Sequence, residues 1–135
     1  MPETPSISLT VLTLVAVGGA LGACARYLVG VGIGSAHSGP FPLGTFVVNV
    51  VGCFVLGFLG ELVAPHHEGT GGMVHYALGV GFLGSFTTFS TFGHETHRLL
   101  EGDAWLLAAA YVAGSVFAGL LLVRAGSFLA MKLFG

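Results

Sequence analysis

The chain contains four long stretches with almost no charged side chains, at residues 9–33, 41–63, 74–96 and 104–128. A helix needs about 20 largely apolar residues to cross a hydrocarbon core of about 30 Å. Only 7% of the 135 residues are charged, whereas soluble domains carry about a quarter because their surfaces face water. The pattern predicts an all-α membrane protein with four transmembrane helices, organised as a single membrane domain over residues 1–135.

The scarcity of charged and reactive groups also restricts the function. With four Lys and Arg residues and a net charge of −2, the chain has no basic patch to neutralise nucleic-acid phosphates. Cys24 and Cys53 both lie in apolar stretches, and we expect them to be packing residues rather than a disulfide or a metal pair. Since no nucleophile–base pair or metal cluster stands out in the stretches, we expect neither an enzyme nor a nucleic-acid-binding protein.

The positive charges favour neither orientation of the chain in the membrane. Four crossings put both termini on one side, with Arg124 and Lys132, and leave Arg26 and Arg98 toward the other. Cytoplasmic loops normally carry an excess of Lys and Arg, but the count here is two against two. This balance favours a dual-topology chain that pairs with its inverted copy as an antiparallel homodimer. The alternative is that a weak bias still selects one orientation.

The third stretch carries an unusual run, GFLGSFTTFSTFG, from Gly81 to Gly93. Gly84 and the adjacent Thr87 and Thr88 weaken helical continuity through backbone entropy and β-branching. A helix that breaks inside the membrane frees backbone groups, which must then be covered by protein or by a site. The run therefore predicts a break in the third helix, where carbonyl oxygens are suited to holding a cation.

Polar and aromatic side chains recur at helical spacing within the stretches. Taken singly, each has an ordinary explanation: hydroxyls bond to their own helix, asparagine links helices and arginine reaches the headgroups. Polar groups inside a membrane are costly, however, and tend to mark function. Their joint occurrence beside the unusual third stretch therefore indicates a site. The set is Thr45 and Asn49, Phe89 and Phe92, Tyr111 and Ser115, and Arg26 as the one charge well within the first stretch.

The charge of the transported species is inferred from the scarcity of carboxylates. Glu61 and Glu95, near the ends of their stretches, are the only acidic residues in all four. A cation or proton transporter usually needs an intramembrane carboxylate. Aromatic edges are electropositive, and with hydroxyl and amide donors beside them they suit an anion that has lost part of its hydration shell. The balance favours a small anion.

Three runs, one in each of the first three stretches, resemble the CrcB/Fluc family of small fluoride channels. They are GGALGACARYLVG, GTFVVNVVGCFVLG and GFLGSFTTFSTFGHET, at residues 18–30, 44–57 and 81–96, in the order of the family. The resemblance implies an antiparallel dual-topology homodimer with two fluoride pores, each lined by both subunits. It also implies a structural sodium ion (Na+) at the dimer centre, held by the backbone carbonyls of Gly84 and Thr87.

The resemblance further implies roles for the residues already singled out. The fluoride pore would be formed by Asn49, Phe89, Phe92, Tyr111, Ser115, Thr88 and Thr45, with Arg26 at a vestibule. Glu95 matches an acidic position of the family, without a role that the sequence assigns. There are two departures: Gly119 stands where the family often carries another hydroxyl, and His94 and His97 flank Glu95. A metal-binding or pH-sensing role for the two histidines is left open.

The implied function is passive, selective export of fluoride across the plasma or inner membrane of the cell, by a multi-pass protein embedded in the lipid bilayer. The alternative is a small four-helix multidrug or cation antiporter of dual topology. Such proteins couple protons through a carboxylate in the first helix, and residues 9–33 contain neither Asp nor Glu. A membrane protein with a purely structural role would leave the polar and aromatic set unexplained.

Overall fold

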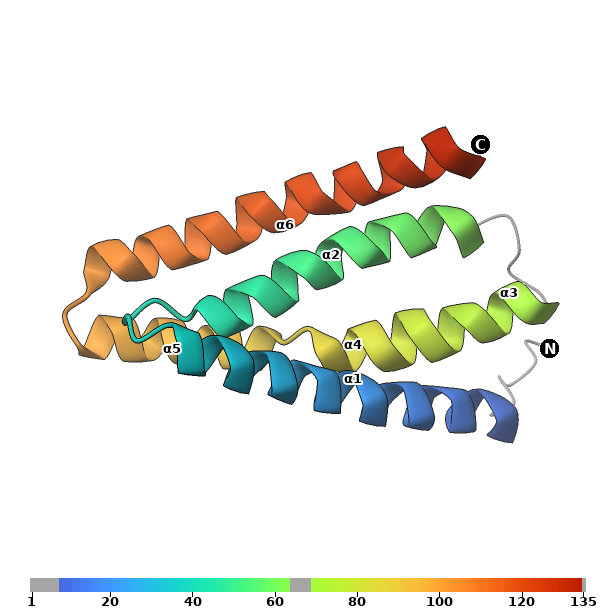
Figure 1. Ribbon diagram of the computed structural model, residues 1–135, viewed down its shortest axis with the longest axis horizontal. Helices are drawn as coiled ribbons and strands as arrows, with labels where there is room; N and C mark the ends of the chain where they lie inside the picture. Colours follow the sequence, from blue (N-terminus) through green and yellow to red (C-terminus); the bar gives the residue numbers. More distant parts are fainter. Residues whose placement is uncertain (1–7, 64–68, 135) are drawn as a thin grey trace, which may run out of the picture.

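A computed structural model describes residues 8–63 and 69–134, and all regular structure in these ranges is helical. The segments are α1 (Leu9–Ala36), α2 (Leu43–Val63), α3 (Gly69–Val74), η1 (His75–Leu83), α4 (Gly84–Phe86), α5 (Phe89–Glu101) and α6 (Trp105–Phe134). α3, η1, α4 and α5 follow one another along a single pass of the chain, so the segments form four passes (Figure 1).

The four passes run alternately up and down the molecule. The start of α1, the end of α2, the start of α3 and the end of α6 lie at one end (Figure 1). The connections from α1 to α2 and from α5 to α6 lie at the opposite end. The predicted number and alternation of the passes are therefore confirmed, and the predicted break in the third pass is present between α4 and α5.

The bounds of the passes differ from the predicted ones at several ends. Three helices, α1, α2 and α6, are long and apolar enough to cross a membrane unbroken. The third pass extends beyond the predicted 74–96 at both ends, and α6 continues past residue 128 because the sequence stays apolar there. α2 begins at Leu43 rather than residue 41. The carbonyl oxygen of Pro42, the residue just before the helix, accepts a hydrogen bond from Phe46 N at 3.0 Å.

Glycines allow the helices to approach to backbone contact. α1 packs along η1 and α4, and α2 packs along α6. A Cβ atom at Gly18 of α1 would overlap the carbonyl oxygen of Ala77, and one at Gly57 of α2 would overlap the carbonyl oxygen of Val123. Membrane helices associate mainly by close packing rather than by a hydrophobic driving force. These two glycines therefore hold the passes together within one chain.

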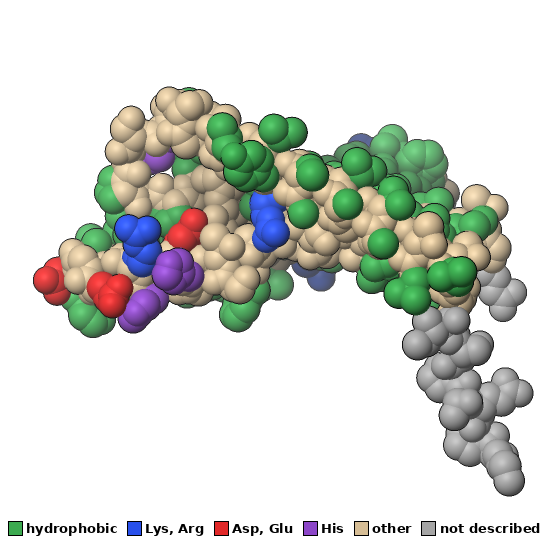
Figure 2. All heavy atoms as spheres, turned by 90° about the horizontal axis from the view of Figure 1, so that it is seen from below, with side chains coloured by type: hydrophobic (Ala, Val, Ile, Leu, Met, Phe, Trp, Pro, Cys, Tyr) green, Lys and Arg blue, Asp and Glu red, His purple; other side chains and the backbone are tan. Residues whose placement is uncertain are grey.

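The buried core is small, and many large apolar side chains are exposed. Its densest part is a cluster of Leu99, Ala108 and Tyr111, against which Phe41 and Phe92 pack. Hydrophobic side chains are scattered along the face seen in Figure 2, while acidic and histidine side chains gather toward the end where α5 meets α6. Exposed apolar area on this scale requires a lipid or protein cover.

Candidate functional site

The break in the third pass consists of two threonines with extended backbone. Thr87 has φ −80° and ψ 160°, and Thr88 has φ −152° and ψ 120°. The hydroxyl of Thr87 donates to the carbonyl oxygen of Leu83, the last residue of η1, at 3.0 Å. The hydroxyl of Thr88 accepts from Thr91 N at 3.2 Å and so caps the N-terminus of α5. Both threonines therefore stabilise helix ends as well as interrupting the helix.

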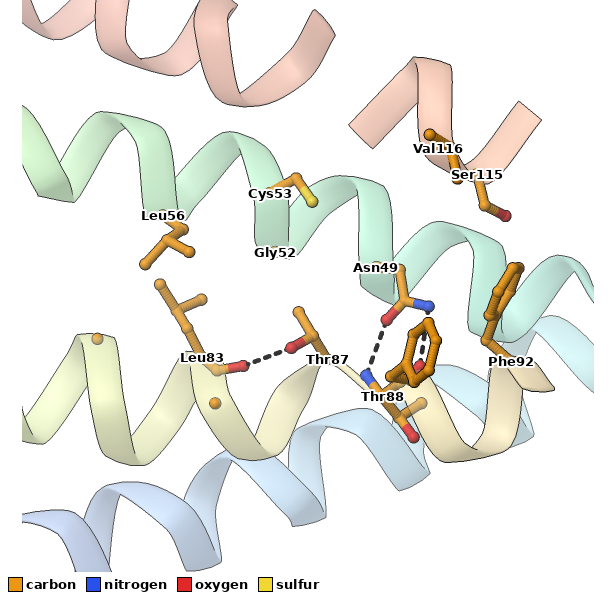
Figure 3. Close-up of a pocket in the computed structure, with 13 residues that line it drawn as sticks. Asn49, Gly52, Cys53, Leu56, Leu83, Thr87, Thr88, Phe92, Ser115 and Val116 are labelled. Carbon is orange, nitrogen blue, oxygen red and sulfur yellow. Dashed lines mark hydrogen bonds between the residues drawn. The ribbon is translucent and has the colours of Figure 1, made fainter. Parts of the chain in front are cut away.

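Asn49 of α2 satisfies the backbone that the break exposes. Its Oδ1 accepts from Thr88 N at 2.8 Å, and its Nδ2 donates to Thr88 O at 3.1 Å (Figure 3). An amide side chain carries both a donor and an acceptor, so one asparagine can pair with both groups of one residue. Unpaired backbone groups away from water are costly. The Asn49 amide thus lets an extended segment exist within the third pass.

Gly52, one turn along α2, gives the break room to pack against this helix. A Cβ atom at Gly52 would overlap the Cγ2 methyl of Thr87. Without that overlap, α2 can lie close enough for the Asn49 amide to reach Thr88. The GTFVVNVVG run of α2 thus supplies both the Asn49 amide and, at Gly52, the missing side chain that lets this amide reach Thr88.

Glu95 links two of the predicted pore residues. Its Oε1 accepts a hydrogen bond from the Thr45 hydroxyl, and its Oε2 accepts one from the Tyr111 hydroxyl, both at 2.8 Å. The carboxylate therefore joins α2, α5 and α6 near the charged end of the molecule. Hydrogen bonds to a charged acceptor are about twice as strong as neutral ones. The hydroxyl hydrogens of Thr45 and Tyr111 are both used by this contact.

The aromatic residues form a row from the buried core to the open face. Phe92 packs against the fully buried Tyr111 with ring centroids 5.1 Å apart, and Phe89 lies 5.8 Å from Phe92. Phe89 itself is 85% exposed in the single chain. The row therefore begins inside the bundle and ends on a surface that the chain leaves uncovered.

Two cavities border the break. The first, the main cavity of the site, has a volume of about 330 Å³ and lies between α2, the third pass and α6 (Figure 3). Its lining includes Asn49, Thr87, Thr88, Phe89, Phe92 and Ser115. The Arg26 cavity, of about 290 Å³, includes Arg26, Thr45, Thr88 and Thr91 in its lining. Thr88 borders both cavities, so the polar residues of the two cavities lie on either side of the break.

The structure thus brings the predicted site residues into one region, but not all in the same way. Tyr111 borders neither of these two cavities and lies behind Phe92, with its hydroxyl on Glu95. The Oγ atom of Ser115 is buried and has no hydrogen-bond partner within residues 8–63 and 69–134. Gly84 and Thr87 both line the main cavity. No hydrogen bond to the carbonyl oxygen of either is donated from those residues.

Sequence reasoning missed several features of this region. The sequence alone assigns no role to Glu95, although its position three residues after Phe92 puts both side chains on one face of a helix. The π-helical geometry of η1, immediately before α4 and the break, was not anticipated; π-helical segments are frequent at functional sites. Cys53, expected to be a packing residue, lines the main cavity.

His94 and His97, which depart from the family pattern, lie at the end of the third pass. Both are exposed, and His97 Nε2 lies 3.3 Å from Glu101 Oε1, one helical turn further along α5. This contact involves neither of the two cavities at the break.

Comparisons with known proteins show the family to which the chain is similar. Residues 13–127 match the family model described as CrcB-like protein, Camphor Resistance (CrcB). A Helicobacter pylori (strain HPAG1) protein named fluoride-specific ion channel FluC is 44% identical over 122 residues, which cover 89% of this chain and 92% of the relative. A Caulobacter vibrioides (strain NA1000) protein of the same name is 44% identical over 123 residues, covering 91% and 97%. A Listeria monocytogenes (serotype 4b, strain F2365) protein named fluoride-specific ion channel FluC 2 is 40% identical over 119 residues, covering 88% and 89%.

Replacing Asn49 should lower the stability of the folded protein, because this side chain pairs with two backbone groups at the break. Asn49→Ala leaves the N–H and C=O groups of Thr88 unpaired, at a cost of about 1–3 kcal/mol each. Asn49→Asp keeps the acceptor for Thr88 N but turns an oxygen toward Thr88 O, so we expect it to be destabilising as well. The measurement is the melting temperature of the purified protein in detergent.

The control for Asn49 is Thr96→Ala. The Thr96 hydroxyl donates to Phe92 O of its own helix at 2.8 Å, and its loss leaves no buried backbone donor unpaired. The explanation is wrong if Asn49→Ala melts at the same temperature as the wild type or as Thr96→Ala.

Proposed function

The chain belongs to the CrcB family, and we propose that it is a multi-pass membrane protein that acts as a passive, fluoride-selective ion channel of the cell membrane. The names of the relatives support this proposal, because proteins 40–44% identical over most of the chain are called fluoride-specific ion channels. The observation that carries it is the main cavity beside the break, lined by Asn49, Phe92 and an unpartnered Ser115 hydroxyl. Such a protein is not an enzyme.

The chemistry of the two cavities favours an anion. The residues that line the main cavity include no carboxylate, and the Arg26 cavity contributes a guanidinium. Selectivity in pores depends on width and on the donors that line them. Ring edges of Phe89 and Phe92 and the hydroxyl of Ser115 offer positive or donating groups to a small anion that has lost part of its hydration.

The residues of the site divide into those that hold the structure and those free to meet an ion. The Asn49 amide uses its oxygen and one N–H for Thr88, and its second N–H donates to none of the residues described. The Thr45 and Tyr111 hydroxyls are occupied by Glu95. The Ser115 hydroxyl and the two phenylalanine edges are not occupied in this way. We therefore assign direct contact with fluoride to Asn49, Ser115, Phe89 and Phe92, and a positioning role to Thr45 and Tyr111.

The driving force for export needs no energy source within the protein. In an acidic medium, fluoride enters cells as neutral HF and dissociates in the more neutral cytoplasm. The membrane potential, negative inside, then favours outward movement of the anion by about 2.3 kcal/mol per charge per 100 mV. A selective passive pore is sufficient to lower the internal concentration of fluoride and hence its toxicity.

The pores are proposed to form in an antiparallel dual-topology homodimer, two per dimer. Phe89 supports an assembly, because a phenylalanine that is 85% exposed beside the polar break lacks the cover that a second copy would supply. The balance of two positive charges toward each side supports insertion in both orientations. Inverted pairing would place the two breaks against each other.

The carbonyl groups at the break fit the structural sodium ion that the family implies. The oxygens of Gly84 and Thr87 have no hydrogen-bond donor among the residues described, and unwound carbonyls of membrane helices coordinate Na+. The proposed ion would be held by these carbonyls from both copies. When bound, it would neutralise the partial negative charges that the carbonyls bring together.

The competing function is a small multidrug or cation antiporter. It requires a carboxylate in the first helix, and α1 contains neither Asp nor Glu. The one carboxylate near the site, that of Glu95, is bound by two hydroxyls. Both observations favour the channel.

Fluoride efflux from liposomes that contain the purified protein tests the channel. Wild-type protein should release fluoride rapidly, as followed by a fluoride electrode, without releasing chloride. Phe89→Ile removes an aromatic edge and should slow the release about tenfold or more, the effect of losing roughly 1.4 kcal/mol of ion stabilisation. Phe128→Ile, at an exposed position on α6, is the matched control and should behave as wild type. Folded protein that releases neither ion contradicts the proposed function.

Dual topology predicts that a single site is reachable from both sides of the membrane. Gly102→Cys, in a chain that also carries Cys24→Ser and Cys53→Ser, places one thiol in the turn between α5 and α6. An impermeant maleimide should label about half of the molecules in intact cells, because balanced charges give no preferred orientation. Permeabilised cells should give complete labelling. Complete or absent labelling in intact cells would show a single orientation.

Removal of sodium tests the proposed cation. Protein purified and reconstituted with N-methylglucamine in place of Na+ should melt at a lower temperature, because a ligand that binds only the folded state stabilises it. Added NaCl should restore the melting temperature and the efflux, whereas an equal concentration of N-methylglucamine chloride should not. The same melting temperature and efflux without Na+ would exclude a structural role for the ion.

A further inference from the structure

Cys53 lies on the cavity-facing side of α2. It follows Asn49 by four residues, so the two side chains share a helical face. Both line the main cavity, together with Phe92 and with Ser115 of α6. Figure 3 shows Cys53 and Ser115 on two different helices that border this space.

The thiol of Cys53 lies beside a position of α6 where a series of polar residues is interrupted by a glycine. Tyr111, Ser115 and Gly119 follow one another at intervals of four residues, and the third of them has no side chain. A Cβ atom built on Gly119 would lie 3.3 Å from Cys53 Sγ. The sulfur atom of α2 therefore stands where a side chain at position 119 would project.

The neighbouring hydroxyl shows that the cavity offers polar groups in need of a partner. Ser115 Oγ is buried with no hydrogen-bond partner, and the Cys53 thiol takes part in none of the hydrogen bonds among the residues described. Buried polar groups in folded proteins nearly always have a partner. The Ser115 hydroxyl and the Cys53 thiol are therefore two donors that this cavity leaves available to a ligand.

We propose that Cys53 is a pore-lining residue, whose S–H group extends the line of donors from Ser115 in place of the hydroxyl that Gly119 lacks. This inference rests on the proposed fluoride channel. A thiol is a weaker donor than a hydroxyl, so it stabilises the ion less and lets it leave the Ser115 position readily. The competing explanation is that Cys53 is a small hydrophobic filler against Gly119.

The test compares fluoride efflux from liposomes for variants that differ by one polar group. Cys53→Ala removes the donor and should slow efflux about three- to tenfold, the range expected for one modest hydrogen bond to an anion. Cys53→Ser restores a donor and should conduct at close to the wild-type rate. In the double variant Cys53→Ala with Gly119→Ser, the donor returns from α6 into the vacated space, and conduction should again approach wild type. Cys24→Ala, at an exposed position on α1, is the matched control and should match wild type.

Elution as a folded dimer and the melting temperature separate conduction from folding. If Cys53→Ala does not fold, the equal-shaped pair Cys53→Thr and Cys53→Val makes the same comparison with the space filled. If the wild type releases fluoride and Cys53→Ala releases it equally fast, the inference is wrong. It is also wrong if Cys53→Ser is as slow as Cys53→Ala. Either result leaves the proposed channel function unaffected. A folded wild type that passes no fluoride overturns the proposed function and this inference with it.

Discussion

The pair of hydrogen bonds between the Asn49 side chain and the Thr88 backbone is the constraint on which the site depends. An extended segment within an apolar bundle exposes an N–H and a C=O group that lipid cannot satisfy. Asn49 pairs with both, at 2.8 and 3.1 Å. Gly52 supplies the close approach that this contact needs. Without the pair, the N–H and C=O groups of Thr88 would be left unpaired, and the extended segment would lose the contact that holds it against α2.

The break also arranges the aromatic residues. α5 starts afresh at Phe89, with Thr88 as its N-cap, so its direction does not have to continue that of α4. Phe92 then faces Tyr111 in the buried cluster, while Phe89 faces outward. One irregular pair of residues therefore determines both the cavity inside the chain and the uncovered surface beside it, which is the surface proposed to meet the second copy.

The second organising contact is the Glu95 carboxylate, which receives hydrogen bonds from Thr45 and Tyr111. A carboxylate near an anion path would repel the ion, and two donated hydrogen bonds reduce its charge toward the path. The same contact fixes two hydroxyls that a sequence-based interpretation assigns to the pore. Within residues 8–63 and 69–134, the buried Ser115 hydroxyl has no partner, and the thiol of Cys53 lies over the next position of its stripe.

The sequence by itself determined the membrane class, the four passes and the break, because these depend on local properties: apolar length, the lack of charge, and the Gly84 and Thr87–Thr88 signals. It also identified most residues of the site by their spacing and their resemblance to a family. Only the tertiary structure decided what each polar group contacts. Asn49 and Thr88 are 39 positions apart, Thr45 and Glu95 are 50 apart, and Cys53 reaches Gly119 from another helix. Such pairs form only when helices pack, so no periodicity within one helix predicts them.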